Sequence, residues 1–185
     1  VSKGYIFLLM KIMYRVIGLD VIVSTGIQDV LFVFALVGMV MGSISAIRQT
    51  DIRRMIAFSS VAQIGYVFMG IGLGTDEGMM AAMLNIFSHA VCKSMLFLAA
   101  GGLADASNNS KKFRDLRGAG FRSSIAGVVF TIGALSMVGF PFLGGFASKL
   151  NFALAAMDVG GARTMLVLIT LAISTWLNTL YFLRT

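Results

Sequence analysis

The sequence predicts an all-α fold, a bundle of helices that crosses a membrane several times. Hydrophobic residues make up 58% of the 185 residues and charged residues only 12%, and a soluble domain of this size has no way to bury so much apolar surface. Apolar runs close to the length of about 20 residues that spans a bilayer as a helix recur through the chain. The only proline interrupts one of them, which predicts a discontinuous helix near Pro141.

The first half of the chain predicts three apolar helices, at residues 1–18, 29–47 and 55–73. Residues 21–28 are expected to connect the first two. The charged stretch at residues 48–54 is too polar to remain in lipid and separates the second helix from the third. Asp76 and Glu77 are expected to close the third helix on the opposite side of the membrane.

The second half predicts further apolar helices at residues 78–103, 123–139 and 164–183, with one long polar loop at residues 105–122. Pro141 lacks a backbone N–H and clashes with the preceding turn. With Gly144 and Gly145 beside it, the helix must break there. Non-helical backbone at membrane depth is tolerated only where it is buried in protein or lines a wet cavity, so the break marks a candidate functional region.

Basic residues gather in the loops at residues 48–54 and 105–122, which fall on one side of the membrane if the helices alternate. Together these loops carry eight Lys and Arg residues. The positive-inside rule therefore predicts that they lie on the cytoplasmic side, or its equivalent, of a prokaryotic plasma membrane or an energy-transducing organelle membrane. The same clustering explains the net charge of +7, and no nucleic-acid partner is expected.

The chain contains one cysteine and one histidine, which excludes a disulfide framework and a His/Cys metal cluster. No flavin, iron–sulfur or nucleotide site is recognisable, so no cofactor is expected in this chain. Val1 lies within an apolar, lysine-bearing segment without the features of a signal peptide. We therefore expect that upstream sequence is missing and that these residues belong to a longer membrane subunit.

The apolar run at residues 78–103 carries the least expected side chains. Asn85, His89 and Lys93 are spaced i, i+4, i+8, so they share one face of the helix. A lysine far from both ends of its span is costly in lipid and is a functional-site hypothesis by default. Two further lysines lie in spans or beside a helix break, and the candidate proton-pathway residues are Lys3, His89, Lys93 and Lys149.

Such groups suit proton transfer, because burial disfavours the charged form of lysine and histidine titrates near neutral pH. Chains of them form proton relays across bilayer interiors. The alternative is structural: a lysine in a span can simply pair with a carboxylate on another helix. No Asp or Glu lies in the interior of the predicted spans, since Asp29 stands at the very start of one, so either the partner lies upstream or the lysines are neutral part of the time.

Three stretches resemble, in order and spacing, motifs of the antiporter-like proton-pumping membrane subunits of complex I, a family shared with Mrp-type cation/proton antiporters and membrane-bound hydrogenases. Residues 50–66, TDIRRMIAFSSVAQIGY, resemble D-[IL]-K-R-x-[IL]-A-[YF]-S-[ST]-x-x-x-x-G. Residues 88–101, SHAVCKSMLFLAAG, resemble a helix with H-A-x-x-K-x-x-L-F-L-x-x-G. Residues 139–149, GFPFLGGFASK, resemble a break with G-x-P-x-x-x-G-F-x-[SG]-K.

The resemblance implies an antiporter-like fold with inverted repeats and two broken helices, of which residues 1–185 would be a partial proton-conducting transmembrane domain, the second half. Lys3 would match the lysine of the first broken helix, paired in the family with an upstream glutamate. Lys93 would match the central lysine, with His89 as its neighbour. Lys149 would match the terminal lysine of the second broken helix, so that a hydrated axis would join all three lysines.

Two departures from the family motifs narrow the set of proton carriers. Arg53 replaces the usual lysine of the first motif, and arginine is effectively never deprotonated. Asn85 stands where some members carry a second histidine, and it can orient water but cannot take a proton. We therefore expect Arg53 and Asn85 to be supporting polar residues, together with Asp51 and Ser88.

The first functional hypothesis is a proton-translocating subunit of a respiratory complex I-type or hydrogenase-type membrane assembly, with the redox chemistry in other subunits. Its partners would be neighbouring membrane subunits, the lipid bilayer and protons. The second is an Mrp-type antiporter subunit, with Na⁺ as the alternative ion. The third is a membrane scaffold that transports nothing and whose lysines are structural.

Overall fold

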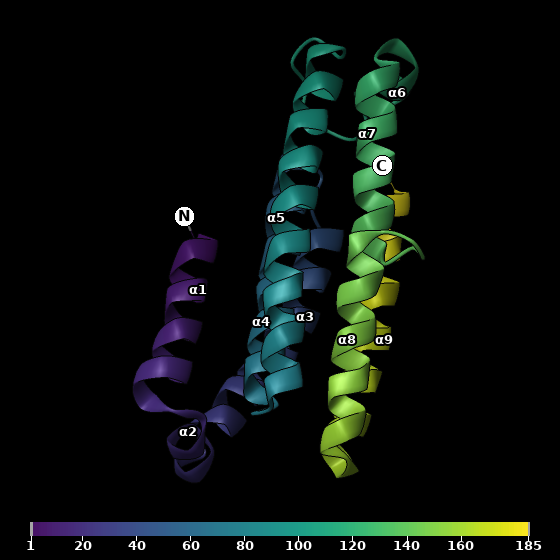
Figure 1. The fold of residues 1–185 in the computed structure, drawn as a ribbon. Coiled ribbons are helices and arrows are strands. Elements are labelled where there is room, and N and C mark those ends of the chain that lie inside the picture. Colours follow the sequence, from purple (N-terminus) through teal and green to yellow (C-terminus); the bar gives the residue numbers. More distant parts are fainter. Residues whose placement is uncertain (1, 185) are drawn as a thin grey trace.

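The computed structural model describes residues 2–184, apart from the side chains of residues 2, 3 and 19. Helices dominate this part of the chain, as predicted (Figure 1). Four of them are long and apolar enough to cross a membrane: α3 (Ile27–Ile47), α4 (Ile52–Gly72), α5 (Asp76–Asp105) and α9 (Gly161–Leu183). The predicted all-α membrane bundle is confirmed.

A short helix lies where a connection was predicted. α1 (Ser2–Ile12) continues into a π-helical turn, η1 (Met13–Ile17), and α2 (Leu19–Thr25) follows it. The prediction of a connection over residues 21–28 is therefore wrong. The glycines on either side of α2 have positive φ angles of 86° and 69°, which glycine adopts without a steric penalty. They turn the chain sharply enough to isolate two turns of helix, a feature that hydropathy does not reveal.

The acidic pair between α4 and α5 also lies differently from the prediction. The Thr75 hydroxyl accepts a hydrogen bond from the backbone N–H of Gly78 at 3.1 Å, so Thr75 caps the N-terminus of α5. Asp76 and Glu77 occupy the first turn of α5, where the helix dipole favours negative charge. They open the fourth apolar helix and do not close the third.

The discontinuous helix is confirmed. α7 (Ser124–Val138) and α8 (Gly144–Val159) lie end to end beside the long helix α5, with Pro141 in the break between them (Figure 1). At the break the two helices approach closely: a Cβ atom on Gly145 would lie 1.7 Å from the carbonyl oxygen of Ser136. Only glycine fits at this position.

The two basic loops lie on the same side, as predicted from helix alternation. The loop at residues 105–122 contains one short helix, α6 (Ala119–Arg122). It pairs with the loop at residues 48–54 through two backbone hydrogen bonds, from the N–H of Ile52 to the oxygen of Lys111 at 3.0 Å and from the N–H of Phe113 to the oxygen of Thr50 at 3.1 Å. These bonds fix the start of α4 against the loop that follows α5.

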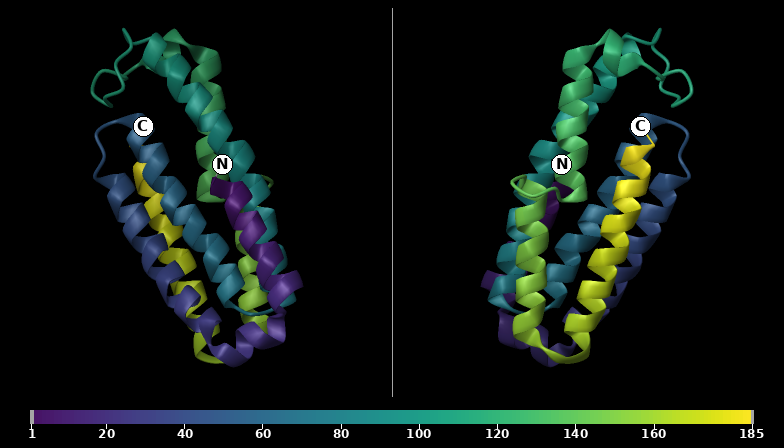
Figure 2. Two further views of the ribbon diagram at one scale, coloured as in Figure 1. Left: turned by 90° about the vertical axis from the view of Figure 1, so that its left-hand side faces the viewer. Right: turned by 90° about the vertical axis from the view of Figure 1, so that its right-hand side faces the viewer.

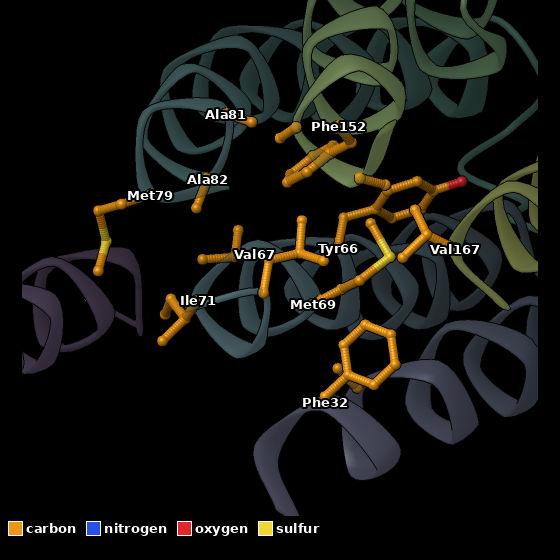
Figure 3. Close-up of a cluster of buried hydrophobic side chains, with 14 of the residues drawn as sticks. Phe32, Tyr66, Val67, Met69, Ile71, Met79, Ala81, Ala82, Phe152 and Val167 are labelled. Atoms are coloured by element: carbon orange, nitrogen blue, oxygen red, sulfur yellow. The ribbon is translucent and has the colours of Figure 1, made fainter. Parts of the chain in front are cut away.

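The helices pack so that α5 contacts α4, α7 and α8, whereas α3 contacts α4 and α9. Figure 2 shows α9 running alongside α3 for most of its length. One cluster of buried apolar side chains joins α4, α5 and α8 (Figure 3). Within this cluster the rings of Tyr66 and Phe152 lie 6.0 Å apart.

Candidate functional site

Lys93 lies at the interface of α5 and α4 and is only 4% exposed. Its Nζ atom donates a hydrogen bond to the backbone oxygen of Ile56 at 2.6 Å and another to the hydroxyl of Ser59. A buried amine needs such acceptors, because an uncompensated charge or polar group inside a protein is costly. The first turns of α4 therefore hold the lysine that the sequence singled out.

The predicted polar face of α5 is buried as a whole. Asn85 and His89 are each 4% exposed, like Lys93. Asn85 donates a hydrogen bond from Nδ2 to the backbone oxygen of Gln63, on α4, at 3.3 Å. The structure thus brings Asn85, His89 and Lys93 together along one helix face, one turn apart, as the spacing predicted.

Lys149 lies on the other side of the helix break and is half-buried. Its Nζ atom donates to the backbone oxygen of Val138, the last residue of α7, at 2.6 Å. It also donates to Oγ1 of Thr175, on α9, at 2.9 Å, and it lies 5.8 Å from the centroid of the Tyr66 ring. The end of a helix leaves carbonyl groups without an intrahelical partner, so the break itself supplies one acceptor for the lysine.

A small polar cavity lies between the two lysine-bearing helices. Its volume is about 10 Å³, and its lining includes side chains from α4, α5, α7 and α8: Gln63, Asn85, Ser88, His89, Cys92, Ser136 and Lys149. A volume of this order is about what one water molecule occupies, and such a water needs two to four polar partners. The cavity has that many, so it can join His89 to Lys149 through one water.

Ser136 holds the break against α5, a role that the sequence analysis missed. Its Oγ atom accepts a hydrogen bond from the backbone N–H of Gly145 at 3.3 Å and one from the thiol of Cys92 at 3.0 Å. The only available signal was a serine in the last turn of an apolar helix, just before a Pro/Gly break. That signal is too common to assign a role.

The supporting residues separate into two groups. Ser88 and Asn85 line the cavity. Asp51 instead caps α4, since its Oδ1 atom accepts from the backbone N–H groups of Arg53 and Arg54 at 2.8 and 3.2 Å. Arg53 is exposed at the same helix end. Asp51 and Arg53 therefore organise the start of α4, and the structure does not place either of them in the lining of the cavity.

The remaining sequence predictions concern Lys3 and metal binding. The backbone of Lys3 belongs to α1, but its side chain lies outside the described residues, so its place on the pathway stays a prediction. Among residues 2–184, no cluster of three or more His, Cys, Asp or Glu side chains that could hold a metal ion is found. The described site offers amines, an imidazole and hydroxyls, which are groups that hold and pass protons.

The transmembrane family model described as NADH:quinone oxidoreductase/Mrp antiporter matches residues 5–175 of this chain. NADH-quinone oxidoreductase subunit N of Desulforudis audaxviator is 35% identical over 183 residues, covering 99% of this chain and 36% of that protein. Subunit L of the same enzyme from Buchnera aphidicola subsp. Schizaphis graminum is 32% identical over 142 residues, covering 75% of this chain and 23% of that protein.

Two solved structures are similar over nearly the whole chain. In the membrane-bound sulfane sulfur reductase, an archaeal respiratory membrane complex, one chain matches with a TM-score of 0.80 and 28% identity, over 97% of this chain and 36% of its own length. In the Mrp complex from Dietzia sp. DQ12-45-1b, one chain matches with a TM-score of 0.82 and 25% identity, over 99% of this chain and 33% of its own length. This chain thus spans about a third of the length of these two relatives.

Proposed function

Because this chain belongs to the NADH:quinone oxidoreductase/Mrp antiporter membrane family, we propose that it conducts protons as part of a longer antiporter-like subunit. It is an integral, multi-pass membrane protein. The subunit would belong to a respiratory complex I-type or hydrogenase-type assembly, whose redox chemistry takes place in other subunits. Residues 1–185 would then form part of its proton-conducting domain, with no cofactor of their own.

The observation that carries this proposal is the cavity between His89 and Lys149. Lys93 lies one helical turn from His89, and His89 and Lys149 both line a cavity with space for about one water molecule. Three titratable groups therefore follow one another without an intervening apolar layer. Such a row inside a membrane protein is expensive to bury and is typical of a proton path.

Each step of the proposed path conserves protons. Lys93 in its ammonium form gives a proton to the neutral imidazole of His89 and becomes a neutral amine. His89 releases a proton to the water in the cavity, and this water passes one to the neutral amine of Lys149. Lys149 ends as the ammonium ion, held by Val138 and Thr175, and the next stroke begins when it is discharged.

The path is further proposed to begin at Lys3 and to lie parallel to the membrane plane. The loops at residues 48–54 and 105–122 would face the cytoplasm or its equivalent, because of their eight basic residues. Other membrane subunits would contact this one, since its relatives belong to NADH-quinone oxidoreductase and to multi-subunit membrane complexes.

The second candidate is an Mrp-type antiporter subunit, in which ion gradients alone drive proton movement. The similarity to a chain of the Mrp complex, at a TM-score of 0.82, favours it as much as the other comparisons favour a respiratory pump. Co-purification with redox subunits would support the pump. Sodium-dependent growth rescue of an antiporter-deficient host would support the antiporter.

The proposal is tested by Lys93→Ala in the complete assembly. The variant is expected to abolish coupled proton translocation while the assembly remains intact, because the central proton carrier of the path is lost. Lys111→Ala is the matched control, since Lys111 is an exposed lysine of a basic loop. Proton translocation at the wild-type rate in Lys93→Ala would instead favour a scaffold whose lysines are structural.

A further inference from the structure

A row of buried or half-buried hydroxyl and amide side chains on α4 and α9 also reaches the same two lysines, and none of its members lines the cavity. Its members are Ser59, Tyr66, Thr175, Asn178 and Tyr181, and neither the family motifs nor the site described above includes them as proton carriers. Four of the five are no more than 1% exposed: Ser59, Tyr66, Asn178 and Tyr181. Each polar group buried in the core of a membrane bundle is costly unless it is hydrogen-bonded.

At one end the row begins at Lys93. The amine donates a hydrogen bond to the hydroxyl of Ser59, and the hydroxyl of Ser59 in turn interacts with that of Tyr181. Tyr181 donates a hydrogen bond to Oδ1 of Asn178 at 2.7 Å. These contacts extend from α5 through α4 to α9.

At the other end the row reaches Lys149. The ring of Tyr66 packs among apolar side chains next to Phe152, and its hydroxyl points away from them (Figure 3). That hydroxyl lies close to the side chains of Ser174, Thr175 and Asn178 on α9, and Tyr66 and Tyr181 are near enough to interact electrostatically. Thr175 accepts a hydrogen bond from Lys149 at 2.9 Å.

The middle of the row carries polar atoms that need a mobile partner. Among the described residues, the hydroxyl of Tyr66 and Nδ2 of Asn178 are buried without a hydrogen-bond partner. Buried polar groups are nearly always hydrogen-bonded to protein or to ordered water, and an exception calls for an explanation. A water molecule at this point would satisfy both atoms and would join the two halves of the row.

We propose that this row is a second proton route between Lys93 and Lys149, parallel to the one through His89; it rests on the proposed function. Lys93 gives a proton to the Ser59 hydroxyl, which gives its own proton to Tyr181. Tyr181 gives its proton to the water beside Tyr66, and this water passes one of its protons to the Tyr66 hydroxyl. Tyr66 gives its own proton to Thr175, whose hydroxyl gives its proton to the neutral amine of Lys149.

The protons balance along this route. Each hydroxyl receives one proton and releases one, so it ends unchanged, while Lys93 becomes a neutral amine and Lys149 an ammonium ion. Hydroxyl hydrogens rotate to suit either neighbour, which this exchange requires. Asn178 carries no proton; it is a positioning residue that holds the hydroxyl of Tyr181 in the row.

A double-variant experiment in the complete assembly distinguishes parallel routes from a single one. His89→Gln removes the first route, and Tyr181→Phe removes one hydroxyl of the second while keeping the ring that packs 4.8 Å from Phe182. Protons translocated per turnover are measured in sealed membrane vesicles for both single variants and for the double variant. Tyr14→Phe is the control, because it removes a tyrosine hydroxyl on η1, outside the row.

With two parallel routes, each single variant keeps a measurable fraction of the wild-type rate. The double variant falls to the background of the vesicles, so it retains less than the product of the fractions that the two single variants retain. The proposal is overturned if Tyr181→Phe has no effect in either background, or if either single variant alone reaches the background. Should Tyr181→Phe fail to assemble, Tyr66→Phe takes its place in the same scheme.

Lys93→Ala tests the proposed function separately, since it blocks both routes. Normal translocation in Lys93→Ala refutes the proposed function. Loss of translocation in Lys93→Ala, together with an unaffected Tyr181→Phe, refutes only the second route.

Discussion

The amine of Lys149 donates a hydrogen bond to the backbone oxygen of Val138 at 2.6 Å, across the break that separates α7 from α8. This carbonyl group ends α7 and has no partner within its helix. A continuous helix would occupy it and would leave the amine without that acceptor. The broken helix and the lysine are thus two parts of one site, and changes at the break should affect proton transfer as well as stability.

The first prediction concerns Gly145. A methyl group there would lie 1.7 Å from the oxygen of Ser136, so Gly145→Ala must push α7 and α8 apart. Overpacking of this kind costs about 1–3 kcal/mol or more. We expect a lower thermal unfolding temperature of the purified assembly. Gly38→Ala is the control, because a methyl group at Gly38 meets no atom within 4 Å, and equal stability of the two variants would contradict the close approach at the break.

The second prediction concerns Ser136. Ser136→Ala leaves the N–H of Gly145 and the thiol of Cys92 without the acceptor they share. An unsatisfied buried donor costs about 1–3 kcal/mol, and the cavity loses one polar group of its lining. We expect reduced stability together with slower proton translocation. Ser94→Ala, which removes an exposed serine of α5, should change neither stability nor translocation. If Ser136→Ala also changed neither, the hydrogen bonds of Ser136 to Gly145 and Cys92 would be dispensable.

The third prediction separates Asp51 from the proton path. Asp51 caps α4 through the N–H groups of Arg53 and Arg54, and replacing such a cap by alanine costs about 1 kcal/mol. Asp51→Asn keeps an accepting oxygen and should retain both stability and translocation, whereas Asp51→Ala should lose stability. Melting curves of the two variants decide this. Loss of translocation in a stable Asp51→Asn variant would assign the carboxylate a part in proton transfer.

The sequence was sufficient to predict the lysine face of α5 and the break at Pro141, because both depend on local rules. Helical spacing puts Asn85, His89 and Lys93 on one face, and proline with neighbouring glycines breaks a helix wherever it lies. Local rules also led to errors. Besides the connection predicted at residues 21–28, where α2 lies, Asp76 is predicted at the end of a span, because its charge indicates water without indicating which helix it belongs to.

The hydroxyl row was not predictable in this way. Ser59 and Tyr181 are more than 100 residues apart in the chain, and α4 and α9 are apolar enough to be read as ordinary spans. A serine or tyrosine in such a helix carries no information about its partners. Only the packing of α9 beside α3 and α4 brings Thr175 to Lys149 and Tyr181 to Ser59.

The central claim is that Lys149 carries a proton, and Lys149→Arg tests it most directly. Arginine keeps a positive charge at the break but does not release its proton. A cavity of about 460 Å³ beside Lys149, between α8 and α9, leaves room for the larger side chain. We predict an assembled complex in which proton translocation in sealed vesicles falls to background. Translocation at the wild-type rate in this variant would contradict proton transfer through Lys149 and would leave it only an electrostatic role.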